Sequence, residues 1–142
     1  MSEQAARDTF KKSIQQQLPG THWQRFEDRF HAGIPDINVC LPGGYEFWVE
    51  AKHLERLPKW KNTPVRVEIR REQVMWLMSR KKAGGRVMVL VRIGLEAWAA
   101  FDDHFERLEE GLPVEAFFQL AKWRGDHLDV RAIFDANSQS LA

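Results

Sequence analysis

The chain has 142 residues, of which 44% are hydrophobic, and its formal net charge is only +1. The length suits one domain with a single core, and the near-neutral charge excludes nucleic-acid binding through bulk charge alone. The one cysteine excludes an intrachain disulfide, and the five histidines lack the spacing of a structural zinc site. No apolar run approaches the roughly 20 residues needed to cross a bilayer, so we expect a cytoplasmic protein with no membrane partner.

Helices and strands are predicted along the whole chain from hydrophobic periodicity, capping residues and turns. In order, we expect a helix at 3–17 capped by Ser2, a short strand within 22–30, a hairpin of strands 37–41 and 45–52, a basic loop at 53–66, a helix at 70–82, a central strand at 86–93, a short strand at 98–101, an acidic stretch at 102–110, a helix from Pro113 to about 123, and a last strand over 128–134. This order predicts an α/β sandwich of the α+β type, with helices flanking a mixed central sheet. We expect a single domain over 1–142, with its core at about 3–101 and an added C-terminal helix and strand at about 102–142.

The predicted hairpin brings two acidic residues and a lysine together. Glu50 and Lys52 lie two positions apart on a strand and therefore face the same side. Asp36 begins the partner strand beside the end of the strand that carries Glu50, so the two carboxylates should converge. Neighbouring carboxylates repel, and Mg²⁺ favours one or two carboxylates with waters and a phosphate oxygen. We expect a metal site of Asp36, Glu50 and the Ala51 backbone carbonyl.

With Lys52 beside the metal, this group suits phosphodiester hydrolysis. Taken singly, an Asp after a proline or a Glu-x-Lys at a strand edge is more typical of ordinary turn and strand-end charges. The expected coupling of the two motifs across one hairpin favours the functional interpretation.

Two motifs carry a family resemblance: Gly33-Ile34-Pro35-Asp36 and, after a short hairpin, Glu50-Ala51-Lys52. They resemble the PD-(D/E)XK nuclease superfamily, and within it the VRR-NUC and Holliday-junction-resolvase branches, over about residues 3–93. The resemblance implies a restriction-endonuclease-like fold, metal ligation by Asp36 and Glu50, and a catalytic Lys52. It also implies that Gln73 supports the site and that Glu3 holds a metal-bound water, with Glu27 as a rival to Glu3. The long loop at 53–66 departs from the VRR-NUC pattern and leaves the branch open.

A local excess of positive charge follows the Glu-x-Lys motif. Seven Lys and Arg residues lie from Lys52 to Arg71 against two Glu residues, a local charge of +5, and Trp60 lies among them. We interpret this stretch as contacting phosphates, with Trp60 against a base or sugar; the alternative is a solvated loop with Trp60 packed on the domain. The candidate DNA-binding residues are Arg25, Arg29, Arg56, Lys59, Trp60, Lys61, Arg66, Arg70 and Arg71. Arg25 and Arg29 have the alternative of pairing with Glu27 and Asp28.

These features predict a Mg²⁺- or Mn²⁺-dependent DNA endonuclease. The resemblance further implies branched DNA as the substrate, cut by a homodimer that presents one site to each strand. Such an enzyme would act in recombination or repair in a bacterial cell or a phage-infected host. Two alternatives stay open: a catalytically inert DNA-binding module on a nuclease fold, and a restriction-type endonuclease that reads a specific sequence.

Overall fold

The computed structural model describes residues 2–27 and 33–138, which form both helices and strands. The elements are α1 (Glu3–Gln17), β1 (His22–Arg25), β2 (Ile37–Leu41), β3 (Tyr45–Leu54), α2 (Arg71–Lys82), β4 (Val87–Ile93), β5 (Ala97–Phe101), α3 (Phe105–Glu110), α4 (Val114–Leu120), β6 (Trp123–Gly125) and α5 (Val130–Ser138). The α+β class is confirmed, and the expected elements up to residue 101 appear within a few residues of their predicted bounds. No helix among the described residues has both the length and the apolar character to span a membrane.

The strands form one mixed sheet in the order β1-β2-β3-β4-β5-β6. Neighbouring strands are antiparallel except β3 and β4, which are parallel, with Glu50 opposite Val89 and Lys52 opposite Val91. A parallel pair requires a crossover, and α2 supplies it after the long loop that follows β3. The first turn of α2 is thereby placed beside the C-terminal end of β3.

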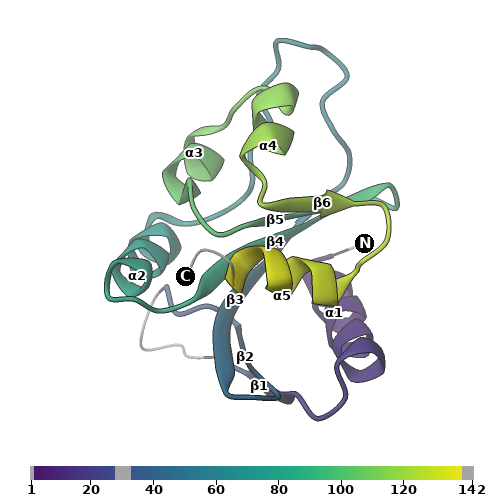
Figure 1. Cartoon of the computed structure of the whole chain (residues 1–142). Coiled ribbons are helices and arrows are strands. Elements are labelled where there is room, and N and C mark those ends of the chain that lie inside the picture. Colours follow the sequence, from purple (N-terminus) through teal and green to yellow (C-terminus); the bar gives the residue numbers. More distant parts are fainter. Residues whose placement is uncertain (1, 28–32, 139–142) are drawn as a thin grey trace.

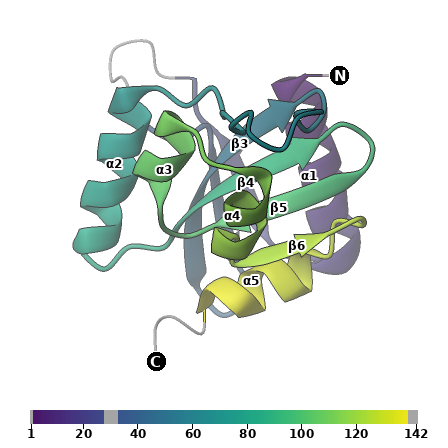
Figure 2. The ribbon, with the colours of Figure 1, turned by 90° about the horizontal axis from the view of Figure 1, so that it is seen from above.

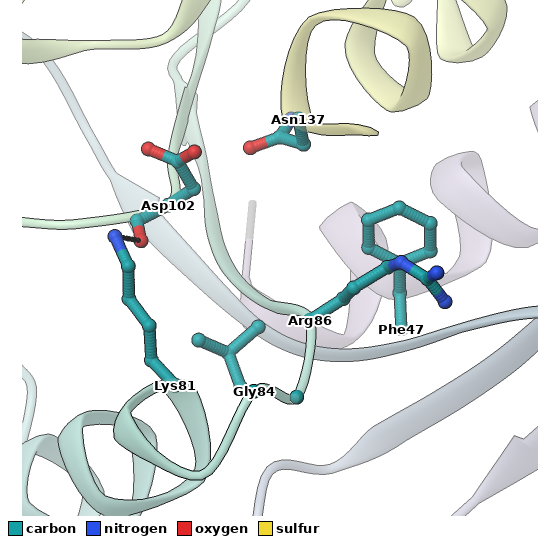
Figure 3. Close-up of a pocket in the computed structure, with 8 residues that line it drawn as sticks. Phe47, Lys81, Gly84, Arg86, Asp102 and Asn137 are labelled. Atoms are coloured by element: carbon teal, nitrogen blue, oxygen red, sulfur yellow. Dashed lines mark hydrogen bonds between the residues drawn. The ribbon is translucent and has the colours of Figure 1, made fainter. Parts of the chain in front are cut away.

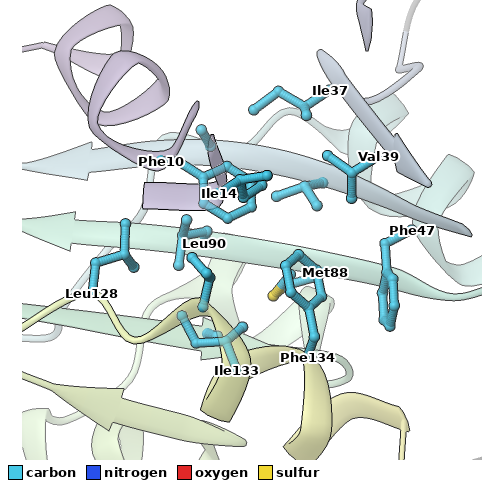
Figure 4. Close-up of a cluster of buried hydrophobic side chains, with 14 of the residues drawn as sticks. Phe10, Ile14, Ile37, Val39, Phe47, Met88, Leu90, Leu128, Ile133 and Phe134 are labelled. Carbon is cyan, nitrogen blue, oxygen red and sulfur yellow. The ribbon is translucent and has the colours of Figure 1, made fainter. Parts of the chain in front are cut away.

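Helices cover both faces of the sheet. Figures 1 and 2 show α1 and α5 on one face, and α2, α3 and α4 on the other. On the first face, Phe10 and Ile14 of α1 and Phe134 of α5 pack against strand residues such as Val39 and Leu90 (Figure 4). On the other face, the buried side chains include Val74, Leu77, Val89, Val91, Phe101, Phe105, Leu108 and Phe117. The apolar area buried on both faces determines where along the strands each helix packs.

Helix α1 begins where capping chemistry predicts. The Ser2 side chain accepts a hydrogen bond from the Ala5 N–H at 3.1 Å, and the helix turns Ala6, Phe10 and Ile14 inward at i, i+4 and i+8. At its other end, Gln17 accepts from the Val130 N–H and donates to the Leu128 carbonyl. This side chain ties the end of α1 to the beginning of α5.

The expected strand over 128–134 is wrong, because this segment forms most of α5. Val130 and Phe134 are an even number of residues apart, so both would lie on one face of a strand. They are also four residues apart, so both lie on one face of a helix. Ile133, which is fully buried, lies on the helical stripe with them. Asp129 caps the helix by accepting from the Ala132 N–H at 3.1 Å.

Three smaller differences occur on the other face. The helix expected to run to about 123 ends at Leu120, and residues 123–125 form β6 instead. The acidic stretch at 102–110, whose composition alone predicts no helix or strand, contains α3. In the predicted α2 stripe of Val74, Leu77 and Met78, the first two are buried and Met78 is 38% exposed.

Candidate active site

Asp36 and Glu50 converge at the open end of the β2–β3 hairpin, as the sequence predicts. The Asp36 N–H donates to Glu50 Oε2 at 3.2 Å, and the Ala51 N–H donates to Asp36 Oδ1 at 3.3 Å. Pairing of β2 with β3 stops at Ile37 and Val49, so the next backbone groups of β3 on that side have no strand partner. Each carboxylate is therefore held by the backbone of the other strand.

Lys52 and Gln73 complete a buried polar network with Glu50. Their exposed fractions are 5%, 6% and 4%, respectively. Gln73 Nε2 donates to Glu50 Oε1 at 2.8 Å, and Lys52 Nζ donates to Gln73 Oε1 at 3.1 Å and lies 3.5 Å from Glu50 Oε1. Gln73 Oε1 also accepts from the Arg70 N–H at the beginning of α2. The amide thus ties the first turn of α2 to both charged side chains of β3.

Helix α1 contributes two further charged groups. Glu3 Oε1 lies 3.5 Å from Lys52 Nζ, whereas Glu27 pairs with Arg25 at 2.9 Å on the surface. Arg7 Nη1 lies 3.0 Å from Asp36 Oδ2, and both side chains are largely buried. Of the two candidates for the extra acidic residue, Glu3 is the one at Lys52.

Burial dominates the electrostatics of the two carboxyl groups. Desolvation raises the pKa of Glu50 to about 7; the Asp36 charge adds to the rise, and Lys52 opposes it. Burial also raises the pKa of Asp36, against the Ala51 N–H and Arg7. Arg7 and Lys52 offset only part of the cost of ionising these buried groups, and a divalent cation would relieve the rest.

The donor set suits a hard cation such as Mg²⁺. In a strand, the N–H and C=O of one residue point to the same side. The Ala51 carbonyl therefore faces the side on which its N–H meets Asp36, next to both carboxylates. Among residues 2–27 and 33–138, no three His, Cys, Asp or Glu side chains form a ready ligand group. Two carboxylates with a carbonyl and waters still match the octahedral oxygen shell of Mg²⁺.

Neither a protein-family model nor a curated protein matches the sequence. Solved structures do match. The structure of Hjc, a Holliday junction resolvase from the archaeal hyperthermophile Archaeoglobus fulgidus, aligns with a TM-score of 0.56 at 17% identity, over 83% of this chain and 93% of that chain. The chain has the fold of a Holliday junction resolvase. A VRR_NUC domain also aligns, with a TM-score of 0.45 at 23% identity, over 66% of this chain and 87% of that chain.

The resolvase fold agrees with the fold that the motifs imply.

The candidate DNA-binding residues are spread around the fold. Arg56, Lys59, Trp60 and Lys61 are exposed on the loop after β3, whereas Arg66 donates to the Glu110 carbonyl and Arg71 lies 3.0 Å from Glu109. Arg70 is exposed at the beginning of α2. Arg29 lies outside the described residues.

Sequence reasoning missed Arg7, whose guanidinium lies against Asp36. A signal was present, because Arg7 follows Glu3 by four residues and so shares its face of α1.

The pocket in Figure 3 is a separate feature at the opposite end of β3. It is lined by Phe47, Lys81 and Arg86, among others, and contains none of the predicted site residues.

Proposed function

We propose that this chain is a divalent-metal-dependent DNA endonuclease that hydrolyses phosphodiester bonds. One observation carries the proposal: Asp36 and Glu50, from two strands, are held together beside Lys52, and all three are largely or fully buried. Burying two carboxylates and an ammonium has a large desolvation cost, which the fold alone does not require. Clusters of this kind are typical of functional sites.

The residues of the chain have distinct parts in the proposed reaction. Asp36, Glu50 and the Ala51 carbonyl would hold the cation, which when bound polarises the phosphate and promotes ionisation of a water. Gln73 fixes the positions of Glu50 and Lys52 through hydrogen bonds of 2.8 and 3.1 Å. Lys52 directs a compact positive charge at the nucleophile or at the charge that develops on the phosphate.

The two α1 residues lie at the border of this group. Glu3, whose side chain is 42% exposed, lies 3.5 Å from Lys52, and its proposed part is to orient a water. Arg7 neutralises Asp36 when no cation is present. Its guanidinium presents further N–H donors that suit a phosphate oxygen of the substrate.

We extend the proposal to branched DNA because the fold is shared with a Holliday junction resolvase. A resolvase must cut two strands, and a C₂ homodimer presents one site to each of them. Sedimentation of the protein with and without a four-way junction tests this part. A monomer in both samples would contradict it.

A cleavage assay tests the proposed activity. The purified chain is incubated with supercoiled plasmid, linear duplex and a four-way junction in Mg²⁺, Mn²⁺ or EDTA. We expect cleavage that requires a divalent cation and favours the junction. Cleavage that persists in EDTA would contradict the metal site, and one defined cut in plasmid would indicate a sequence-reading enzyme.

Lysine variants make the assay specific. Lys52→Ala should lower the cleavage rate by roughly 10²- to 10³-fold, as loss of a transition-state donor does in other enzymes. Lys122→Ala, on an exposed lysine between α4 and β6, removes the same charge away from the site and should cleave normally. Junction binding without cleavage in every metal would favour the inert DNA-binding module.

A further inference from the structure

The loop between β3 and α2 encloses a cleft next to the candidate active site. Figure 1 shows this loop beside α4, and an isolated antiparallel bridge between Val65 and Leu112 joins it to the segment between α3 and α4. The cleft has a volume of about 480 Å³, which is in the range of ligand-binding clefts. The bridge fixes its far wall to the rest of the fold.

The cleft has an apolar floor and a positive rim. Leu54 and Leu57 pack against the buried cluster on the α2 face, and Val65 is 1% exposed. Arg56, Lys59 and Arg66 line the rim. None of the described residues that line the cleft is acidic. Such a cleft suits a ligand that combines a flat apolar ring with negative charge.

Trp60 stands at the edge of this cleft with 77% of its surface exposed. Trp60 begins a tight turn in which its carbonyl accepts from the Thr63 N–H at 3.0 Å, and its indole stays exposed to solvent. The alternative that Trp60 packs on the domain is therefore wrong. Exposing an indole to water forgoes the stabilisation of burying it, whereas an exposed aromatic beside cations is the usual platform for stacking a nucleobase.

We infer that this cleft receives an unpaired nucleotide of the DNA substrate, stacked on Trp60. A base within a duplex is covered by its neighbours, so only an extruded or single-stranded base can enter such a cleft. The inference rests on the proposed function and narrows its substrate class to DNA in which a nucleotide close to the cut is unpaired or can be extruded.

Position on β3 relates the cleft to the candidate active site. Leu54 follows Lys52 by two residues and points to the same side of the sheet. The two residues are about 7 Å apart along the strand. Successive nucleotides advance roughly 3.4 Å along a DNA strand. The Leu54 part of the cleft floor therefore lies about two nucleotides' length along the strand from Lys52, and we expect the unpaired nucleotide close to the phosphodiester bond at Lys52.

A binding experiment with 2-aminopurine DNA in EDTA tests this inference without any cleavage. The probes are one duplex with the 2-aminopurine paired and a matched duplex with the same base unpaired in a one-nucleotide bulge. Affinity is measured by anisotropy, and stacking by quenching of the 2-aminopurine emission. We expect tighter binding and stronger quenching with the bulged DNA.

Three variants assign the effect to the indole. Trp60→Ala should weaken binding of the bulged DNA by about 5- to 150-fold while leaving the paired duplex unchanged, and Trp60→Phe should restore most of the difference. Tyr45→Ala removes an aromatic that is 49% exposed at the other end of β3 and should change neither affinity. Thermal unfolding should be the same for wild type and Trp60→Ala, because the indole is exposed.

Equal affinity of the wild type for the two probes, or an equal loss for both in Trp60→Ala, would overturn the inference. Because binding is measured in EDTA, this result is independent of catalysis. Cleavage without a Trp60-dependent preference would leave the nuclease proposal intact. A Trp60-dependent preference in a protein that never cleaves would instead contradict the proposed nuclease activity and support the proposed nucleotide cleft.

Discussion

Burial of the Glu50 carboxyl group should make the metal-free protein lose stability as the pH rises. The folded state raises the pKa of this group from 4.5 to about 7. Below pH 4.5 the group is protonated in both states, so its contribution to stability is intact. Between the two values the unfolded chain ionises first, and above pH 7 the loss is complete. At about 1.4 kcal/mol per pH unit, the full loss amounts to about 3 kcal/mol.

Glu50→Gln isolates this effect, because glutamine has nearly the same shape and does not ionise. The free energy of unfolding is measured by urea titration with tryptophan fluorescence, in EDTA, from pH 5 to pH 8. Groups that do not interact with Glu50 contribute equally in both proteins and cancel in the difference. From pH 5 to pH 8 the wild type should lose about 2–3 kcal/mol relative to Glu50→Gln. Parallel profiles for the two proteins would refute the conclusion that ionisation of Glu50 destabilises the metal-free fold.

Two controls sharpen the test. Glu46→Gln changes a half-exposed carboxylate on the same strand and should keep the wild-type pH profile. Mg²⁺ at pH 8 should restore stability to the wild type, because a bound cation compensates the Glu50 charge. The same addition should stabilise Glu50→Gln much less.

Three further substitutions test other parts of the structure. Gly33→Ala should lower stability by about 1–3 kcal/mol in urea titration and reduce cleavage, because Gly33 has φ +95° and an added Cβ would lie 2.3 Å from the Glu72 carbonyl oxygen; unchanged stability would contradict this close approach. Arg7→Gln should destabilise the metal-free protein by about 1–3 kcal/mol, and Mg²⁺ should recover part of the loss in a thermal shift assay; a variant as stable as wild type would show that the pair with Asp36 contributes nothing. Phe134→Ala should cost about 3–5 kcal/mol in chemical unfolding, whereas a loss below about 1 kcal/mol would mean that α5 is not packed on the sheet.

The meeting of Asp36 with Glu50 was predictable because it depends only on local rules. Strand alternation and a short hairpin determine which side chains share a face and which ends of the strands adjoin. The place of Gln73 depends on a parallel pairing of β3 with β4 across more than thirty residues, which no local pattern encodes; only the family resemblance indicated it. For Arg7, the spacing of four from Glu3 indicates a shared helix face, but contact with Asp36 also depends on where α1 packs along the sheet, which is set by tertiary contacts.

The C-terminal region shows a different limit. Its apolar residues fit both a strand and a helix over a short span, and periodicity alone cannot separate the two for so few residues. The burial of Ile133 and the cap at Asp129 settle the matter in favour of a helix. The hydrogen bonds from Gln17 reinforce that outcome from more than a hundred residues away, and no sequence window contains them.

Whether one divalent cation binds between Asp36 and Glu50 is decided most directly by a crystal soaked in Mn²⁺. We predict an anomalous difference peak with oxygen atoms of both carboxylates and of the Ala51 carbonyl at roughly 2.0–2.3 Å, and with the Arg7 guanidinium moved from Asp36. A peak elsewhere on the molecule, or none between these carboxylates at saturating Mn²⁺, would contradict it.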